Sequence, residues 1–213
     1  MRIIVTGLPR SGSTLLWQII NEIRTIKPNL MINLVREHGG ANTELYDVIF
    51  ITYRDIREIM VSLVNSHSNE DNEDLTFREK LIITLNNPTV NYYISEFEKL
   101  YELRINNPKI IAVKYENYLP TDIEGYIKYV TEDIIKLTYE EIKMISNKFS
   151  LKNNKLVMKS FEDFSQYDPK TMIHGNHITS NGEHDTWKKY FDSDLVEAIN
   201  PKIKMLIKKL GYV

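Results

Sequence analysis

Short apolar runs alternate along the chain with longer segments whose apolar residues recur at helical spacing. The runs at 3–5, 30–35, 48–53 and 109–114 are rich in β-branched residues and predict buried strands. Helical spacing is clearest at 55–66, where apolar side chains recur every three or four residues behind an acidic start. Further helices are predicted at 14–26, 123–130, 139–148 and 195–210, with two more inside 75–105 that break near Asn87 and Pro88.

Strands that alternate with helices predict an α/β fold with a mostly parallel central sheet and helices on both of its faces, a three-layer sandwich. Residues 67–74 are polar and acidic, which predicts a surface loop. Residues 152–186 show no clear periodicity and contain two glycines, so we expect a long segment that covers a ligand. No internal repeat or linker divides the chain, and residues 1–213 are expected to form a single domain.

Composition and charge narrow the classes of protein. The chain has 42% hydrophobic and 26% charged residues, which is typical of a globular protein. A net charge of -2 gives no electrostatic case for binding nucleic acid or an anionic membrane, so any site for a polyanion must be local. There is no cysteine, no signal-peptide core and no apolar run of 18 residues. We therefore expect a cytoplasmic protein with no membrane anchor.

The first candidate site follows the first strand at 7–14, with the sequence GLPRSGST. A glycine-containing loop between a strand and a helix directs backbone N–H groups at an anion, and the helix dipole favours negative charge there. The spacing is close to that of a Walker loop, but Ser13 stands where the lysine belongs, which weakens a nucleoside-triphosphate interpretation. Arg10 offers a positive charge instead. The alternative is a plain turn in which glycine and serine only satisfy the backbone geometry.

The second candidate site begins where the strand at 48–53 ends. Arg54 follows that strand, at an edge where open α/β sheets bind ligands, and Ser62 lies off the apolar stripe of the next helix. Arginine suits bidentate contact with phosphate. The alternative is a solvated helix start in which Arg57 and Glu58 are surface charges.

Together these two elements resemble the sulfotransferases that use 3′-phosphoadenosine 5′-phosphosulfate (PAPS). Residues 9–14 are similar to the loop of that family that binds the 5′-phosphosulfate, which assigns donor binding to Arg10, Ser11, Gly12, Ser13 and Thr14. Arg54 and Ser62 have the eight-residue spacing of the family's motif for the 3′-phosphate. The resemblance implies a P-loop-like strand, loop and helix.

Two later stretches extend the resemblance. Residues 111–119 are similar to a family strand that ends in tyrosine and an acidic residue, which would place Tyr115 beside the adenine. Residues 180–188 are similar to a late glycine-containing loop that ends in tryptophan and lysine. Basic residues precede that glycine in many members, whereas Ser180 and Asn181 stand here, so contact through the backbone of Gly182 is expected.

A histidine in the stretch VREHGG supplies the candidate base. Arg36 and His38 resemble the lysine and histidine that cytosolic members carry at this place, and histidine titrates near neutral pH. Glu37 is the alternative base, and a surface role for His38 is also open. The resemblance implies that His38 takes a proton from the acceptor while Arg10, with Arg36, stabilises charge on the transferred sulfuryl group.

The sequence therefore predicts transfer of a sulfuryl group from PAPS, with PAP (3′-phosphoadenosine 5′-phosphate) as product, to a hydroxyl or amine. The acceptor is a small molecule, a carbohydrate or a peptide. The other histidines have no metal-ligand spacing, and no metal is expected. A kinase-like phosphotransferase with the same loop and a noncatalytic nucleotide-binding protein of the same fold remain alternatives.

Overall fold

Four parallel strands form the central sheet of the computed structural model: β1 (Arg2–Gly7), β2 (Asn33–Arg36), β3 (Val48–Tyr53) and β4 (Ile110–Lys114). Their order is β2-β1-β3-β4, and every neighbouring pair is parallel, so all four carboxyl ends lie at one edge. The structure describes residues 1–66, 74–118, 122–163, 165–175, 177–178, 183 and 185–212.

Helices account for most of the remaining chain. They are α1 (Ser13–Ile26), α2 (Ile56–Ser66), α3 (Phe77–Leu85), α4 (Pro88–Leu103), α5 (Tyr115–Tyr118), α6 (Ile123–Thr131), α7 (Tyr139–Lys148), α8 (Leu151–Met158), α9 (Ser193–Ala198) and α10 (Pro201–Lys209). Short 3-10 turns occur at η1 (Pro28–Leu30) and η2 (Thr186–Lys189), and β5 (Tyr167–Asp168) pairs with β6 (Ile173–His174) in a separate antiparallel hairpin. No described helix is both long enough and apolar enough to cross a membrane.

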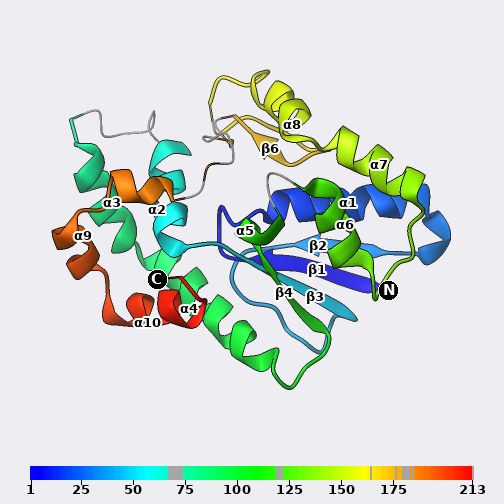
Figure 1. Cartoon of the computed structure of the whole chain (residues 1–213), viewed down its shortest axis with the longest axis horizontal. Coiled ribbons are helices and arrows are strands. Elements are labelled where there is room, and N and C mark those ends of the chain that lie inside the picture. The colour runs from blue at the N-terminus through cyan, green and yellow to red at the C-terminus, as the bar shows by residue number, and fades with distance from the viewer. Residues whose placement is uncertain are drawn as a thin grey trace.

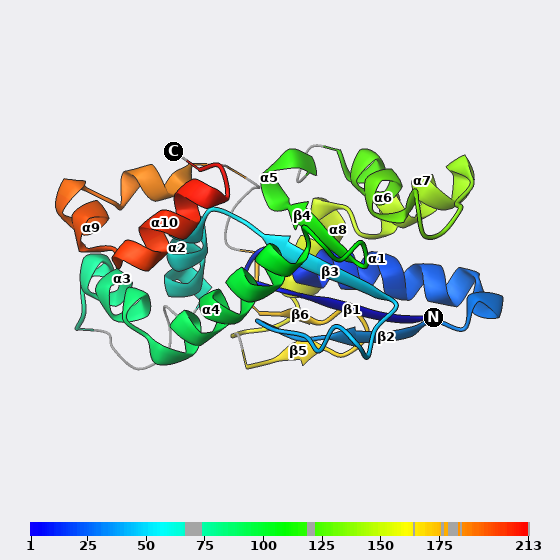
Figure 2. The same ribbon diagram turned by 90° about the horizontal axis from the view of Figure 1, so that it is seen from below.

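The sheet has a hydrophobic core on each face, because side chains alternate between faces along a strand. Ile3, Val5 and Phe50 pack in one core with helices α1, α6 and α7. Ile4 and Ile49 pack in the other, which also takes residues of α2, α4 and α10. Figures 1 and 2 show α4 across the sheet from α1, α6 and α7, with α2, α3, α9 and α10 gathered in a helical lobe beyond one end. The predicted α/β fold with a parallel sheet and helices on both faces is confirmed.

Most predicted elements form, and their boundaries differ where proline intervenes. The second strand starts at Asn33 rather than at residue 30, because Pro28–Leu30 forms a 3-10 turn. The helix predicted at 195–210 is two helices, since Asn200 caps a new helix whose first residue is Pro201. The segment 152–186, which shows no clear periodicity, contains most of α8 and the β5–β6 hairpin. Of the loop predicted at 67–74, residues 67–73 lie outside the described residues.

The turn after β1 depends on close backbone contact with β3. Gly7 pairs with Thr52 across the two strands, and the Leu8 amide donates to the Thr52 carbonyl at 3.1 Å. Gly7 has φ +131°, and a Cβ there would stand 2.2 Å from the Thr52 oxygen. Only glycine permits this approach, which sets the direction in which the chain leaves the sheet toward α1.

The start of α2 is fastened to η2 by buried charges. Asp55 and Arg57 are 4% and 8% exposed, and the Arg57 guanidinium donates to the Asp55 carboxylate at 2.6 and 2.9 Å while lying 3.6 Å from the centre of the Trp187 ring. Glu58 accepts from the Trp187 amide at 3.0 Å and from the Thr186 hydroxyl at 2.7 Å. The alternative in which Arg57 and Glu58 are surface charges is wrong, because both are buried against a segment about 130 residues later in the chain.

Replacing Gly7 with alanine tests the close approach of β1 to β3. We expect Gly7→Ala to lower the free energy of unfolding by about 2–4 kcal/mol, since the added methyl group meets backbone atoms at a positive φ. Gly211→Ala is the matched control, because Gly211 also has a positive φ, +79°, but no atom lies within 4 Å of its built Cβ. Its cost should be about 1 kcal/mol. Equal losses in urea unfolding would contradict the crowding at Gly7.

Arg57→Ala should destabilise the protein by about 3–5 kcal/mol, because it leaves the buried Asp55 carboxylate without its cation. Arg78→Ala removes an ion pair with Asp192 whose side chains are 44% and 57% exposed, and it should cost less than about 1 kcal/mol. Urea unfolding of the two variants measures the difference. A loss for Arg57→Ala as small as that for Arg78→Ala would show that the buried network does not hold α2 to η2.

Candidate active site

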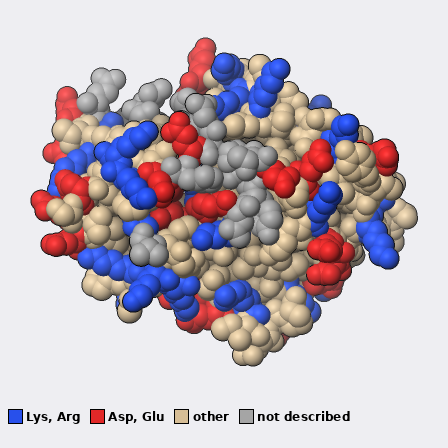
Figure 3. Space-filling model, in the orientation of Figure 1, with Lys and Arg blue, Asp and Glu red and all other residues tan. Residues whose placement is uncertain are grey.

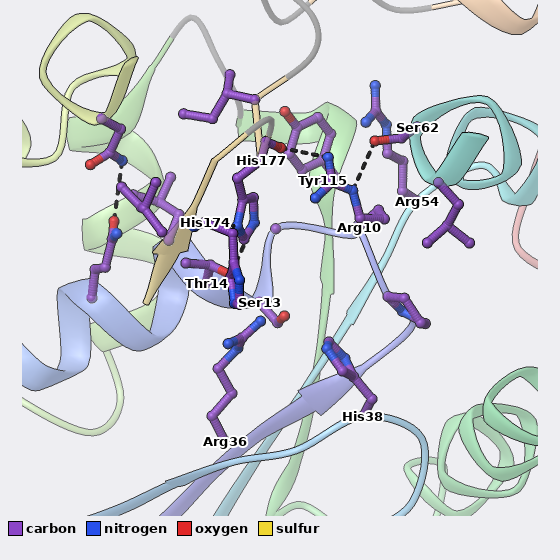
Figure 4. A pocket seen from close by; sticks show the side chains of 18 of the residues that line it. Arg10, Ser13, Thr14, Arg36, His38, Arg54, Ser62, Tyr115, His174 and His177 are labelled. Atoms are coloured by element: carbon purple, nitrogen blue, oxygen red, sulfur yellow. Dashed lines mark hydrogen bonds between the residues drawn. The ribbon is translucent and has the colours of Figure 1, made fainter. Parts of the chain in front are cut away.

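Each strand of the sheet delivers predicted site residues to one cavity of about 390 Å³. Arg10 follows β1, His38 follows β2, Arg54 follows β3 and Tyr115 follows β4, and all four line the cavity. Figure 4 shows Arg36 and His38 on one side of the loop after β1, with Arg54, Ser62 and Tyr115 on the other. The parallel register therefore brings together residues that are far apart in the sequence.

The loop at 7–14, hereafter the glycine loop, ends in an uncapped helix start. Gly12 adopts φ 90° before the first turn of α1 and supplies no side-chain cap, so the amides of that turn remain suited to an anion. Ser13 and Thr14 line the cavity. The Ser11 hydroxyl instead bonds within the fold, 2.7 Å from the hydroxyl of Thr52 and 3.1 Å from its carbonyl oxygen. Because its hydroxyl is engaged in these bonds, Ser11 would contact a ligand through its backbone N–H.

Arg10 joins the glycine loop to α2. Its backbone is left-handed, with φ 60°, and its Nε donates to the Ser62 hydroxyl at 3.0 Å. A terminal nitrogen donates to the His177 carbonyl at 2.5 Å. Burial, and after it the nearby charge of Arg54, lowers the pKa of Arg10 to about 10. The guanidinium stays protonated at neutral pH, and because it is buried, a nearby anion would stabilise its charge.

Arg54 is 5% exposed and lies with its guanidinium 4.5 Å from the centre of the Tyr115 ring. One terminal nitrogen is 3.4 Å from Glu58 Oε2 and 3.4 Å from the Glu183 carbonyl. Its buried Nε has no hydrogen-bond partner among the described residues. Arg54, Ser62 and Tyr115 thus share one wall of the cavity, whereas Gly182 lies outside the described residues.

Arg36 and His38 line the cavity from β2, while the intervening Glu37 is exposed. Burial, together with the charges of Arg36 and Arg10, lowers the pKa of His38 to about 4. Burial also lowers the pKa of Arg36. Because a histidine of pKa 4 is neutral at pH 7, His38 has the protonation state that a base requires. Glu37, the alternative base, faces away from the site.

Several cavity residues were not predicted from the sequence. Tyr93 lies with its ring 5.8 Å from that of His38, and Phe149 lines the cavity from the end of α7. The Asn154 side chain donates to Gln18 Oε1 at 3.1 Å, and Gln18 Nε2 donates to the Thr171 carbonyl at 2.7 Å. Their positions follow from tertiary packing of segments that carry no local motif, so the sequence offered no signal.

His174 and His177 are two further cavity residues without a sequence signal for this role. His177 Nε2 lies 3.3 Å from the Thr14 hydroxyl. Burial lowers the pKa of His177 well below its ordinary value, and the charges of Arg10 and Arg36 act in the same direction. In the described part of the chain, no group of three or more histidine and carboxylate side chains is arranged to hold a metal.

The positive charge of the site is local. On the face shown in Figure 3, lysine and arginine side chains are interspersed with acidic ones. Arg10, Arg36 and Arg54 instead converge on the cavity. This arrangement suits a small ligand that carries more than one anionic group.

Comparison with solved structures finds the same fold. Mouse sulfotransferase SULT7A1 complexed with PAP matches with a TM-score of 0.65 at 14% identity, covering 98% of this chain and 88% of the other. Retinol dehydratase in a complex with retinol and PAP matches with a TM-score of 0.70 at 16% identity, covering 98% and 80%. The same enzyme with androsterone and PAP gives 0.70 at 15% identity over 98% and 80%.

Sequence comparison identifies the family. No curated protein sequence matches the chain significantly. The profile described as "Sulfotransferase domain" matches residues 48–211, which include Arg54, Ser62 and Tyr115 but not the glycine loop. This match spans more than half of the chain. The protein belongs to the sulfotransferase domain family.

Proposed function

We propose that this protein transfers the sulfuryl group of PAPS to a hydroxyl or amine of an acceptor and releases PAP. The observation that carries the proposal is the convergence of three arginines and a neutral histidine on one cavity at the carboxyl edge of the sheet. Residues 1–213 would act as one domain. PAP is bound in the solved structures of two proteins with this fold, which supports PAPS as the donor.

The cavity fits the two anionic ends of the donor. The uncapped start of α1 and the side chains of Arg10, Ser13 and Thr14 suit the 5′-phosphosulfate. Arg54 and Ser62 suit the 3′-phosphate, and the backbone of Gly182 is proposed to complete that site. Arg54 Nε is buried without a hydrogen bond to a described residue, a cost that an anion would remove. Tyr115, which packs on the Arg54 guanidinium, is proposed to contact the adenine.

The chemistry assigned to the site is an in-line displacement at sulfur. The acceptor oxygen or nitrogen forms a bond to sulfur while the bond from sulfur to the bridging phosphate oxygen breaks, and PAP leaves with the electron pair of that bond. His38 takes the proton that the acceptor loses. Arg10 and Arg36 face the charge that develops on the sulfuryl and bridging oxygens. Side-chain cations and backbone amides neutralise the donor, so the proposal requires no metal.

The acceptor is proposed to be a small molecule with an apolar body. Leu63, Val90 and Tyr93 line the cavity, and the Tyr93 ring packs beside His38. An apolar group there would place its hydroxyl or amine next to the base. Retinol and androsterone, which are bound in retinol dehydratase structures of this fold, have such bodies. A carbohydrate or peptide acceptor would leave this wall without an apolar partner.

PAP should raise the melting temperature by several degrees at a concentration well above its Kd, since it binds only the folded protein. ATP with magnesium should do so far less, because Ser13 replaces the lysine of a Walker loop. Arg54→Ala should lose most of the PAP shift, whereas Arg24→Ala, an exposed site on α1 with the same change in charge, should keep it. A larger, magnesium-dependent shift with ATP in a thermal denaturation assay would favour the phosphotransferase.

His38→Ala should lower single-turnover transfer by about 10²–10⁴-fold, the usual contribution of a general base, while PAP affinity stays within about twofold. Glu37→Gln is the matched control, because Glu37 is exposed and should leave both quantities unchanged. Rapid quench with saturating PAPS measures transfer, and calorimetry measures PAP affinity. Normal turnover in His38→Ala together with a loss in Glu37→Gln would show that the base is assigned to the wrong residue.

A further inference from the structure

A histidine from a remote segment contacts the glycine loop at two points. His177 follows the β5–β6 hairpin and lies more than 160 positions from the loop in sequence. Its carbonyl oxygen accepts from Arg10 at 2.5 Å, and its ring Nε2 lies 3.3 Å from the Thr14 hydroxyl. Figure 4 shows the ring beside Thr14, on the cavity side of the loop. His177 therefore faces the place proposed for the 5′-phosphosulfate.

The hydrogen bonds of the ring determine which nitrogen carries its proton. The His174 amide donates to His177 Nδ1 at 3.4 Å, so that nitrogen is an acceptor. In the neutral ring the proton is then on Nε2, the nitrogen that faces Thr14. Burial and the charges of Arg10 and Arg36 keep the pKa of His177 well below its ordinary value, so the ring is neutral at pH 7.

This tautomer separates the roles of the two cavity histidines near the loop. The Nδ1 lone pair of His177 is directed at the His174 amide, and Nε2 carries the proton. The ring therefore presents a hydrogen-bond donor to the cavity rather than a base. His38 lies on the other side of the loop beside Tyr93, where the acceptor is proposed to bind. His38 thus lies toward the place proposed for the sulfuryl acceptor, and His177 lies toward the place proposed for the sulfuryl donor.

We propose that His177 is a donor-binding residue whose Nε2–H donates a hydrogen bond to the 5′-phosphosulfate seated on Ser13 and Thr14. This assignment rests on the proposed function. The Thr14 hydroxyl and the His177 ring would share the same anionic oxygens, opposite the Arg10 guanidinium. Because the His177 ring is neutral, it adds a directed hydrogen bond to the 5′-phosphosulfate without adding a further positive charge to those of Arg10, Arg36 and Arg54.

Two ligands that differ by the 5′-phosphate test the assignment. PAP carries both phosphates, whereas adenosine 3′-monophosphate lacks the 5′ group. His177→Phe keeps an aromatic ring without a donor and should raise the Kd for PAP roughly tenfold, the effect of losing one hydrogen bond to a charged group. Its Kd for adenosine 3′-monophosphate should change by less than about twofold. Isothermal titration calorimetry measures both constants.

Two further variants keep the outcome interpretable. His177→Gln retains an N–H donor near the position of Nε2 and should keep the Kd for PAP within about threefold of the unmodified protein. Arg54→Ala should weaken both ligands, because both carry the 3′-phosphate. Unchanged PAP binding by His177→Phe, or equal losses for the two ligands, would overturn the assignment. Failure of the unmodified protein to bind PAP would instead refute the proposed function on which the assignment depends.

Discussion

The site depends on the parallel register of four short strands, which places the residues after β1, β2, β3 and β4 at one edge. In that register Gly7 pairs with Thr52, and a side chain on Gly7 would collide with the neighbouring backbone. The chain turns there into the glycine loop and α1, so the direction of the anion-binding helix start is fixed by sheet packing. A shift of one residue in β2 would also exchange His38 and Glu37 between cavity and solvent.

Burial of the charged and titratable side chains of the site is the second constraint, and it determines their pKa values. Arg54 is almost fully buried, and burial is the main cause of the lowered pKa of Arg10, Arg36 and His38. Three cations close together oppose one another, and among the described residues the carboxylate paired with Arg54 is that of Glu58, at 3.4 Å. A ligand with two anionic groups would relieve that repulsion, while burial, together with the charges of Arg36 and Arg10, keeps His38 neutral. Donor binding and the availability of a base thus have a common physical origin.

Local sequence patterns predicted the parts of the site that depend on local structure. The glycine loop, the arginine after β3 and the amphipathic α2 each follow from a short stretch, and their order on parallel strands determines that they meet. Partners far away in the sequence determine the rest. From the local sequence, Arg57 resembles a solvated helix residue and His177 a loop histidine. In the structure, Trp187 packs on the Arg57 guanidinium, and His177 lies beside Thr14. The apolar periodicity of 195–210 continues across the break between α9 and α10, so it does not reveal the new helix that begins at Pro201.

Transfer itself is the most direct test of the central claim that one cavity binds the donor and delivers its sulfuryl group to an acceptor. The protein would be incubated with sulfur-labelled PAPS and a pool of small apolar alcohols, phenols and amines, and the products identified by mass spectrometry. The account predicts a labelled acceptor that gains one sulfuryl group, together with an equal amount of PAP. Tight PAP binding with no label on any acceptor, from alcohols to carbohydrates and peptides, would contradict it and indicate a nucleotide-binding protein without transferase activity.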